Sequence, residues 1–253
     1  MAREWLYGRQ AVLASLRARR RHCFSLWLAR GVQVKGTVQE ILAEAEARAC
    51  PVQRVEREAI LKRVGHSGHQ GVALEVSGYP YLDEGEMVAR VRDAGGEALV
   101  LLLDHLQDPQ NVGNVLRTAE IAGVTVAVMP RKRAVGVTPA VVNASAGAVE
   151  YLAVARVTNL VRAMEKLQDA GVWVYALEGR ADVPPYWAVD LSGPVGIVVG
   201  SEGTGLSRLV REHSDGLLRI PMWGRTPSLN AAVAGALALY EVRRQRSTER
   251  GEA

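Results

Sequence analysis

Residues Val195–Glu241 read VGIVVGSEGTGLSRLVREHSDGLLRIPMWGRTPSLNAAVAGALALYE. A short apolar run, Val195–Val199, is followed by the glycine-rich loop Gly200–Gly205. A second apolar run, Leu217–Ile220, is followed by a loop that ends at Asn230, and an alanine-rich helix is expected after it. Buried strands that end in loops of small and polar residues form ligand sites in open α/β sheets. The loops after these two runs are therefore the predicted ligand site.

Upstream of this stretch, from Ala98 onward, apolar runs alternate with segments of helical periodicity. Asn111 is a plausible N-cap for the first helix of this series. Strands that are apolar on both faces, with helices between them, indicate a mostly parallel sheet covered on both sides. The expected strands of this region, in addition to the two above, are Ala98–Leu103, Val124–Met129, Tyr151–Ala155 and Val172–Leu177. The expected helices are Val112–Ala122, Pro139–Ala146, Leu160–Ala170 and Ser228–Arg246.

Residues 1–78 show a shorter alternation of the same kind, which indicates a small α/β sandwich. Its expected strands are Cys23–Ala29, Pro51–Val55 and Gly71–Val76, and its expected helices cover 11–20, Thr37–Arg48 and Glu56–Arg63. Gly78–Met87 carries glycine, proline and acidic residues between the two periodic regions. Such a composition is typical of a linker. The predicted organisation is a first domain over 1–78, a linker over 79–95 and a larger domain over 96–253.

The composition is that of a soluble globular protein. The 253 residues are 48% hydrophobic and 23% charged, and the formal net charge of +4 permits an anionic partner such as nucleic acid without demanding one. Cys23 and Cys50 have no CxxC spacing, and the five histidines form no ligand cluster, so no metal site is expected. No window approaches 18 uncharged apolar residues, and the start has no signal-like apolar segment. A cytoplasmic location is the expectation.

Basic residues gather near position 20 in a run formed by Arg17, Arg19, Arg20, Arg21 and His22. Two interpretations remain open from the residues alone. Basic side chains are favourable at helix C-termini, so the run is compatible with a solvated helix end. It is equally compatible with a phosphate-binding patch for nucleic acid.

A first motif, DPQNVGNVLRTAE, covers Asp108–Glu120 directly after the first strand of the larger domain. If a helix starts near Val112, Asn114 and Arg117 lie three residues apart on one face, close to its N-terminus. A helix N-terminus with asparagine and arginine nearby suits a phosphate or a ribose hydroxyl. The alternative is that Asn111 only caps the helix while Arg117 pairs with a carboxylate such as Glu120.

Two further motifs follow in order, Val199–Leu206 (VGSEGTGL) and the segment from Ile220-Pro221-Met222 to Ser228-Leu229-Asn230. Together the three motifs resemble the SpoU/TrmH branch of the SPOUT RNA methyltransferases, over nearly the whole chain. The opening Tyr7-Gly8-Arg9-Gln10 and the segment His69–Glu75 resemble the members that methylate a guanosine ribose of 23S rRNA. In those members a domain similar to ribosomal protein L30e precedes the catalytic domain.

The resemblance implies methyl transfer from S-adenosylmethionine to a ribose 2′-hydroxyl of RNA, with no metal. It also implies that the loops after the last strands form a trefoil knot around the cofactor, an exception to unknotted connectivity. A further implication is a homodimer through the catalytic domain, in which residues of the first motif reach toward the partner's cofactor. Partners other than RNA and a second copy, such as a membrane, are not expected.

Residue by residue, the resemblance assigns two groups of positions. Cofactor binding is assigned to Gly200, Ile220 and Leu229, with Met222 and the turn Leu177-Glu178-Gly179 lining the same pocket. Catalytic or positioning roles are assigned to Arg117, Asn114, Glu202, Ser228 and Asn230. Apart from the resemblance, the basic residues Arg9, Arg19, Arg20 and Arg21 are the predicted RNA-binding positions.

Within these assignments, Arg117 is expected to hold the target phosphate and stabilise developing charge rather than remove the proton, because a neutral guanidine is costly at neutral pH. Glu202 is the runner-up, after Arg117, for the base that accepts the proton of the 2′-hydroxyl. Trp223 and Pro227 depart from the small residues more common in the family's loop. Trp223 is expected either to pack at the rim of the pocket or to offer a surface for base stacking.

Three functions compete. The first is an rRNA ribose 2′-O-methyltransferase. The second, of the same class, is a tRNA guanosine or antibiotic-resistance rRNA 2′-O-methyltransferase. The third is an RNA-binding protein that keeps the fold without catalysis, against which the presence of Arg117, Asn114 and Ser228-Leu229-Asn230 argues. A nicotinamide dehydrogenase is disfavoured because GSEGTG lacks the GxGxxG spacing.

Overall fold

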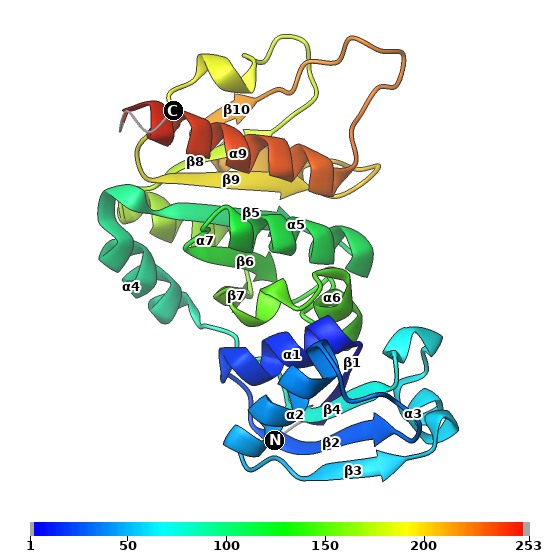
Figure 1. Ribbon diagram of the computed structural model, residues 1–253. Helices are drawn as coiled ribbons and strands as arrows, with labels where there is room; N and C mark the ends of the chain where they lie inside the picture. Colours follow the sequence, from blue (N-terminus) through cyan, green and yellow to red (C-terminus); the bar gives the residue numbers. More distant parts are fainter. Residues whose placement is uncertain (1–2, 250–253) are drawn as a thin grey trace. The chain divides into compact units, whose positions relative to one another are not determined.

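The computed structural model of the chain describes residues 3–249 and is drawn in Figure 1. Contacts between residues divide it into two compact units. The first unit comprises the chain up to Pro80 together with the inserted segment Val137–Tyr151. The second unit comprises Tyr81–Gly136 and the chain from Leu152 onward. The sequence places 137–151 in the larger domain, whereas in the structure this segment belongs to the first unit.

The first unit is built on a four-stranded mixed sheet with the order β1-β4-β2-β3. Strands β1 and β2 are both antiparallel to β4, whereas β3 is parallel to β2. The strands are β1 (Arg3–Tyr7), β2 (Cys23–Ala29), β3 (Val52–Val55) and β4 (Val72–Ser77). The helices are α1 (Arg9–Ala18), α2 (Thr37–Ala47), α3 (Arg57–Val64), the short η1 (Ser67–His69) and, from the inserted segment, α6 (Pro139–Ala144) and η3 (Ala148–Glu150).

Strand β1 was not predicted from the sequence. It is five residues long, begins with two charged residues and pairs along one edge of β4, with Leu6 opposite Leu74. So short a strand shows too little alternation of apolar and polar residues to stand out from a loop. The remaining strands and α-helices of this unit lie within two residues of their predicted bounds, whereas the short helices η1 and η3 were not predicted.

The second unit contains a six-stranded sheet in which every pairing is parallel, in the order β10-β8-β9-β5-β6-β7. This confirms the predicted parallel α/β sheet. The strands are β5 (Leu99–Asp104), β6 (Val126–Pro130), β7 (Val154–Val157), β8 (Trp173–Leu177), β9 (Val195–Gly200) and β10 (Gly216–Leu218). The helical segments are α4 (Glu84–Ala94), η2 (Gly95–Glu97), α5 (Pro109–Ile121), α7 (Leu160–Asp169), η4 (Tyr186–Ala188), α8 (Arg208–His213) and α9 (Ala231–Glu249).

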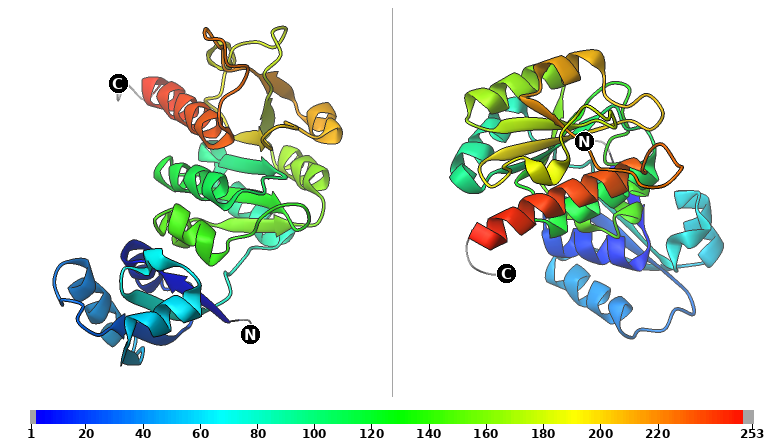
Figure 2. Two further views of the ribbon diagram at one scale, coloured as in Figure 1. Left: turned by 90° about the vertical axis from the view of Figure 1, so that its right-hand side faces the viewer. Right: turned by 90° about the horizontal axis from the view of Figure 1, so that it is seen from above.

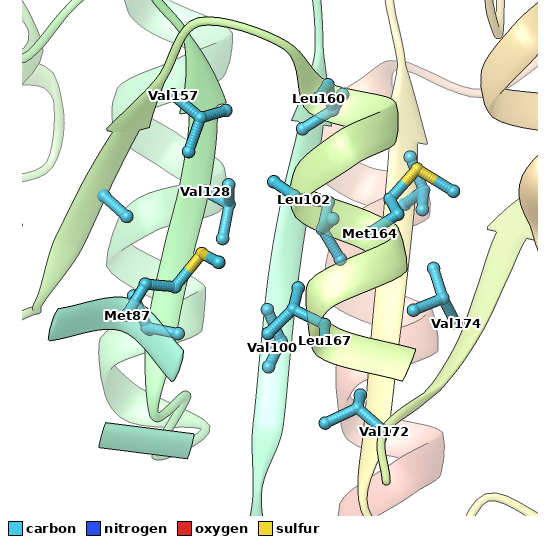
Figure 3. Close-up of a cluster of buried hydrophobic side chains, with 14 of the residues drawn as sticks. Met87, Val100, Leu102, Val128, Val157, Leu160, Met164, Leu167, Val172 and Val174 are labelled. Carbon is cyan, nitrogen blue, oxygen red and sulfur yellow. The ribbon is translucent and has the colours of Figure 1, made fainter. Parts of the chain in front are cut away.

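Helices cover both faces of this sheet, as the left view of Figure 2 shows. On one face, side chains of α4 and α7 pack on the central strands, and Figure 3 shows Met87, Met164 and Leu167 against the strand residues of this core. On the other face, α5 and α9 pack against each other, and α9 also packs against β9. Double coverage explains why β5 and β9 are almost continuously apolar.

The segment expected as a linker, 79–95, contains helix α4. The carboxylate of Asp83 accepts a hydrogen bond from the backbone N–H of Glu86, and Glu86 accepts one from the backbone N–H of Asp83. This reciprocal pair is a capping box, which starts a helix. Met87 and Val91 then bury one face of α4 in the core. The acidic residues that suggested a solvated linker are therefore the helix start signal.

Candidate active site at the carboxyl ends of the parallel strands

A cavity of about 520 Å³ lies where β8, β9 and β10 end, and we call it the strand-end cavity. It is lined by the turn after β8, the glycine-rich loop after β9 and the long loop after β10, which is orange in Figure 1. All six residues predicted to bind the cofactor line it: Leu177, Gly179, Gly200, Ile220, Met222 and Leu229. Glu202, Ser228 and Asn230 line it as well. The two loops singled out by the sequence thus enclose a single cavity.

The glycine-rich loop is held in a tight turn that leaves no room for a side chain at its start. Ser201 and Gly205 exchange backbone hydrogen bonds of 3.1 and 2.9 Å. A Cβ atom on Gly200 would lie 2.5 Å from the carbonyl carbon of Gly205 and 2.7 Å from the backbone nitrogen of Leu206. Gly203 and Gly205 have positive φ, a conformation that favours glycine. The close return of the backbone at Gly200 therefore fixes this wall of the cavity.

Three polar side chains join the loops to helix α5 at the edge of the cavity. Asn111 donates its side-chain amide to Oε1 of Glu202 at 2.7 Å, and Asn230 donates to the same oxygen at 2.8 Å. Asn230 also donates to Oδ1 of Asn111 at 2.8 Å. Its own Oδ1 accepts from the backbone N–H groups of Ala232 and Val233, so Asn230 caps α9. We call Asn111, Glu202 and Asn230 the amide–carboxylate triad.

The expected role of Asn111 as N-cap of α5 is wrong. Asp108 caps this helix by accepting from the backbone N–H groups of Gln110 and Asn111, and Pro109 occupies the first turn. Asn111 is the third residue of α5, in its first turn, and its buried side chain is available for the triad. It was missed as a site residue although it stands within the quoted first motif.

Asn114 and Arg117 do not line the strand-end cavity of their own chain. Both are exposed on α5, and the spacing to exposed Ile121 places all three on one face of that helix. The predicted alternative, an ion pair between Arg117 and Glu120, is absent from the ion pairs of residues 3–249. Arg117 is thus presented outward on the side of the unit that carries α5 and α9.

A second cavity, of about 600 Å³, lies on the flank of the same glycine-rich loop and is lined by Asp108, Asn111, Glu202 and residues around the end of β5. Buried Asp104 accepts from the backbone N–H of Ser207 at 2.6 Å and contacts the Nδ1 of His105. Arg133 lines the same cavity and ends the exposed run Arg131–Arg133 after β6. This basic run was missed in the sequence, although three consecutive basic residues after a buried strand were a usable signal.

Two arginines of the basic run near position 20, Arg20 and Arg21, have partners within the first unit. The Arg21 side chain is 0% exposed and forms a bidentate pair with buried Glu150, at 3.0 and 2.7 Å. Arg20 donates to the hydroxyl of Tyr79 and to the carbonyl of Glu150. The buried guanidinium of Arg21 is not accessible to a phosphate, whereas Arg20 is only partly buried and its assignment to RNA stays a prediction. Arg19 is exposed and Arg9 is half-buried, and their assignment to RNA stays a prediction.

Within residues 3–249 the chain has neither a cluster of metal ligands nor a membrane-spanning helix. No three His, Cys, Asp or Glu side chains there are grouped as metal ligands would be. No helix in that range combines the length and the apolar character that crossing a bilayer requires.

The fold and the cavity define a class: a doubly covered parallel α/β unit with a small-molecule site in the loops at its carboxyl edge. Two family models match the chain. The SpoU rRNA Methylase family matches residues 98–240, and the model described as RNA 2′-O ribose methyltransferase substrate binding matches residues 5–82. The chain belongs to the SpoU rRNA methylase family.

Individual proteins agree with this assignment. The 23S rRNA (guanosine-2′-O-)-methyltransferase RlmB of Xanthomonas campestris pv. campestris is 41% identical, over 96% of this chain and 97% of the relative. The TrmH family relative YacO of Bacillus subtilis, whose name leaves tRNA and rRNA open, is 37% identical over 96% of both chains. The structure of an AdoMet-bound rRNA methyltransferase from Sinorhizobium meliloti is 26% identical, with a TM-score of 0.78 over 96% of this chain and 87% of that one.

Proposed function

We propose that this protein transfers a methyl group from S-adenosylmethionine to a ribose 2′-hydroxyl of RNA, and that its substrate is a guanosine of 23S rRNA. The observation that carries the proposal is the convergence of three strand-end loops on one cavity, bordered by the amide–carboxylate triad, in a chain of the SpoU family. The choice of 23S rRNA is supported by relatives such as RlmB, which match this chain over nearly its full length.

The residues of the strand-end cavity fit S-adenosylmethionine. Its volume of about 520 Å³ falls within the roughly 300–1,000 Å³ typical of small-molecule sites. Leu177, Ile220, Met222 and Leu229 supply apolar walls for an adenine ring, and the loop backbones supply donors and acceptors for its edge. Glu202 adds a carboxylate at the border of the cavity.

When bound, S-adenosylmethionine would supply a sulfonium-activated methyl group, whose carbon bonds to the ribose 2′-oxygen as the S–CH3 bond breaks, S-adenosylhomocysteine leaves and the hydroxyl gives up its proton. The chain's part in such a reaction is proximity, alignment and control of charge. Asn230 fixes the start of α9 and, through Glu202, the position of the glycine-rich loop. Arginine keeps its charge at neutral pH, so Arg117 stabilises negative charge on the 2′-oxygen or on the neighbouring phosphate.

The outward position of Arg117 supports a homodimer in which it completes the partner's site. Helix α9 exposes Val233, Leu237 and Tyr240, whose spacing of four and three residues places them on one face. Helix α5, packed beside α9, exposes Ile121 on the face that carries Arg117. Exposed apolar residues gathered on adjacent helices are typical of an interface between protein chains. We assign it to a second copy of this chain.

Two finer features of the fold belong to the same proposal. We propose that the path from β10 through the long loop to α9 is the trefoil knot of the family. The support is that α9, which follows edge strand β10, packs on β9 in the interior of the sheet order. We also propose that the first unit is an L30e-like RNA-binding domain, supported by its small α/β sandwich and by the substrate-binding match over residues 5–82.

The proposal is tested by incubating the protein with labelled S-adenosylmethionine and unmodified bacterial rRNA or tRNA, and then mapping ribose 2′-O-methylation. We expect one methylated guanosine in 23S rRNA. Methylation of tRNA alone would overturn the rRNA assignment. A failure to bind S-adenosylmethionine in calorimetry would instead favour a non-catalytic RNA-binding protein.

A further inference from the structure

Trp223 is the most exposed of the large apolar side chains described, with 86% of its surface accessible. It lies in the long loop between β10 and α9, which is orange in Figure 1. The expectation that Trp223 packs at the rim of the pocket therefore fails. A tryptophan held in solvent loses the stabilisation that burial would give it, so its exposure needs another explanation.

A second exposed tryptophan lies beside it. Trp187, in η4, is 46% exposed, and its ring is nearly parallel to that of Trp223, with an interplanar angle of 9° and ring centroids 6.4 Å apart. Tyr186 meets Trp187 edge-on at 5.2 Å. Both distances are within the range of interacting aromatic pairs. Residues from two separate segments thus align their ring faces, and we call Trp187 and Trp223 the tryptophan platform.

The loop that carries Trp223 also lines the strand-end cavity. Met222 and Pro227, on either side of Trp223 in the chain, both line that cavity. The cavity side of the loop therefore faces the proposed cofactor, while Trp223 faces solvent.

The charges around the platform favour an anionic partner. Arg225 is exposed two residues after Trp223, and within residues 3–249 its side chain has no hydrogen-bond or ion-pair partner. The acidic groups on neighbouring segments have partners of their own. Asp182 binds the guanidinium of Arg180, and Asp190 accepts from the hydroxyl of Ser192. Glu241 on α9 is paired with Arg244.

We propose that the tryptophan platform stacks an unpaired base of the RNA beside the methylated nucleotide, with Arg225 contacting its phosphate. This proposal rests on the proposed function and adds to it a single-stranded segment as the element recognised. Flat aromatic faces bind any base, because every base has a π face, and an adjacent cation holds the backbone. A folded protein partner would require a wider apolar surface than two rings.

The test uses the full-length protein and a short fluorescein-labelled single-stranded RNA, followed by fluorescence anisotropy. A second RNA carries abasic residues in place of its central bases, so that it keeps every phosphate. We expect Trp223→Ala to weaken binding of the intact RNA by roughly 5- to 150-fold, the range for losing one stacked base. Trp223→Phe should keep most of the affinity. The abasic RNA should bind the wild type and Trp223→Ala equally well.

Trp173→Ala is the matched control. Trp173 is also a largely exposed tryptophan of the second unit, but it begins β8, at the end of the sheet opposite the cavity. Its replacement should leave RNA affinity unchanged. The proposal is overturned if Trp223→Ala binds intact RNA as tightly as the wild type, or if Trp173→Ala loses as much affinity.

Calorimetry with S-adenosylmethionine separates this proposal from the proposed function. Trp223→Ala should bind the cofactor like the wild type. If the variant loses as much affinity for the cofactor as for RNA, the substitution has disrupted the loop that lines the cavity, and base stacking is overturned. If the wild type binds RNA through the platform but methylates no RNA, the proposed function fails while the stacking site stands.

Discussion

Asn230 donates its side-chain amide to Oδ1 of Asn111 at 2.8 Å, although the two residues are 119 positions apart in the chain. The contact ties the start of α9 to the first turns of α5. Both amides also donate to one oxygen of Glu202. The triad therefore sets the relative position of two helices and the glycine-rich loop. With one carboxylate oxygen already accepting two amides, Glu202 fits a positioning role better than that of the base.

Replacing Glu202 distinguishes these two roles. Glu202→Gln keeps an acceptor oxygen for Asn111 and Asn230, so a positioning residue should retain kcat within about tenfold of the wild type. Glu202→Ala removes the acceptor and should lower kcat/KM further, together with cofactor affinity in calorimetry. Loss of a general base costs roughly 10²–10⁴-fold in rate. A Glu202→Gln variant with that loss and normal cofactor affinity would restore Glu202 as the base.

Arg117 is predicted to act in the partner's site, and mixed dimers test this. Arg117→Ala and Asn230→Ala should each be nearly inactive alone. A mixed dimer contains one chain of each variant. If Arg117 and Asn230 of a given site come from different chains, one of the two sites in the mixed dimer has both residues intact. Random co-assembly should then restore about a quarter of wild-type methyl transfer, since half of the dimers are mixed and each has one good site. No recovery, with dimers present, would place both residues in one chain's site.

A conservative change at the same position tests the chemistry. Arg117→Lys keeps the positive charge but not the planar fork that binds a phosphate through two hydrogen bonds. We therefore expect a large loss of kcat, measured at saturating RNA and cofactor. A near wild-type rate for Arg117→Lys would contradict the assigned role.

The apolar face of α9 should hold the dimer together. Leu237→Arg places a charge where a second copy would bury an apolar side chain, and we expect sedimentation to show a monomer. Leu61→Arg is the matched control, because Leu61 is similarly exposed on α3 of the first unit, outside the proposed interface. A Leu237→Arg protein that sediments as a dimer would rule out this face.

How far the sequence predicts the structure depends on the range of the interactions involved. The apolar runs of β5 and β9 predict buried parallel strands, because a strand covered on both faces is apolar at nearly every position. The composition of 79–95 misleads, because Asp83 and Glu86 look like solvated charges until their capping box is seen.

Long-range pairings are the part that the sequence does not reveal. Arg21 and Glu150 are 129 positions apart, so nothing near Arg21 marks it as buried rather than free for RNA. Asn111 is 91 positions from Glu202, and the sequence around Asn111 suggests only a helix cap. The loops of the strand-end cavity were predictable because their residue types and order are a family pattern, whereas the triad that joins them depends on tertiary folding.

The buried pair of Arg21 and Glu150 should be essential to the stability of the first unit. Arg21→Ala leaves the carboxylate of Glu150 buried without its cation, which costs roughly 3–5 kcal/mol. Urea denaturation measures this loss, and Arg21→Met combined with Glu150→Met should cost less than the sum of the single changes. The exposed pair of Arg30 and Glu56 is the control, and Arg30→Ala should cost no more than about 1 kcal/mol. Additive effects at Arg21 and Glu150 would contradict a coupled pair.

Tyr79 should make the stability of the first unit fall at high pH. Burial raises its pKa to about 12, above the model-compound value of 10.0. The folded protein therefore holds the phenolic proton more tightly than the unfolded chain does. This contribution is complete below pH 10 and is lost as the pH rises toward 12, by up to about 2.7 kcal/mol for two pKa units.

The variant Tyr79→Phe isolates that contribution. At pH 8 it should be less stable than the wild type, because the hydroxyl donates to the carbonyl of Val149 and accepts from Arg20, each at 3.0 Å. Between pH 10 and 12 the wild type should lose this advantage, since it must bury a phenolate or release it to solvent, whereas phenylalanine has nothing to ionise. Urea unfolding at several pH values measures the difference between the two proteins. A difference that stays constant up to pH 12 would show that Tyr79 is not responsible for the alkaline loss of stability.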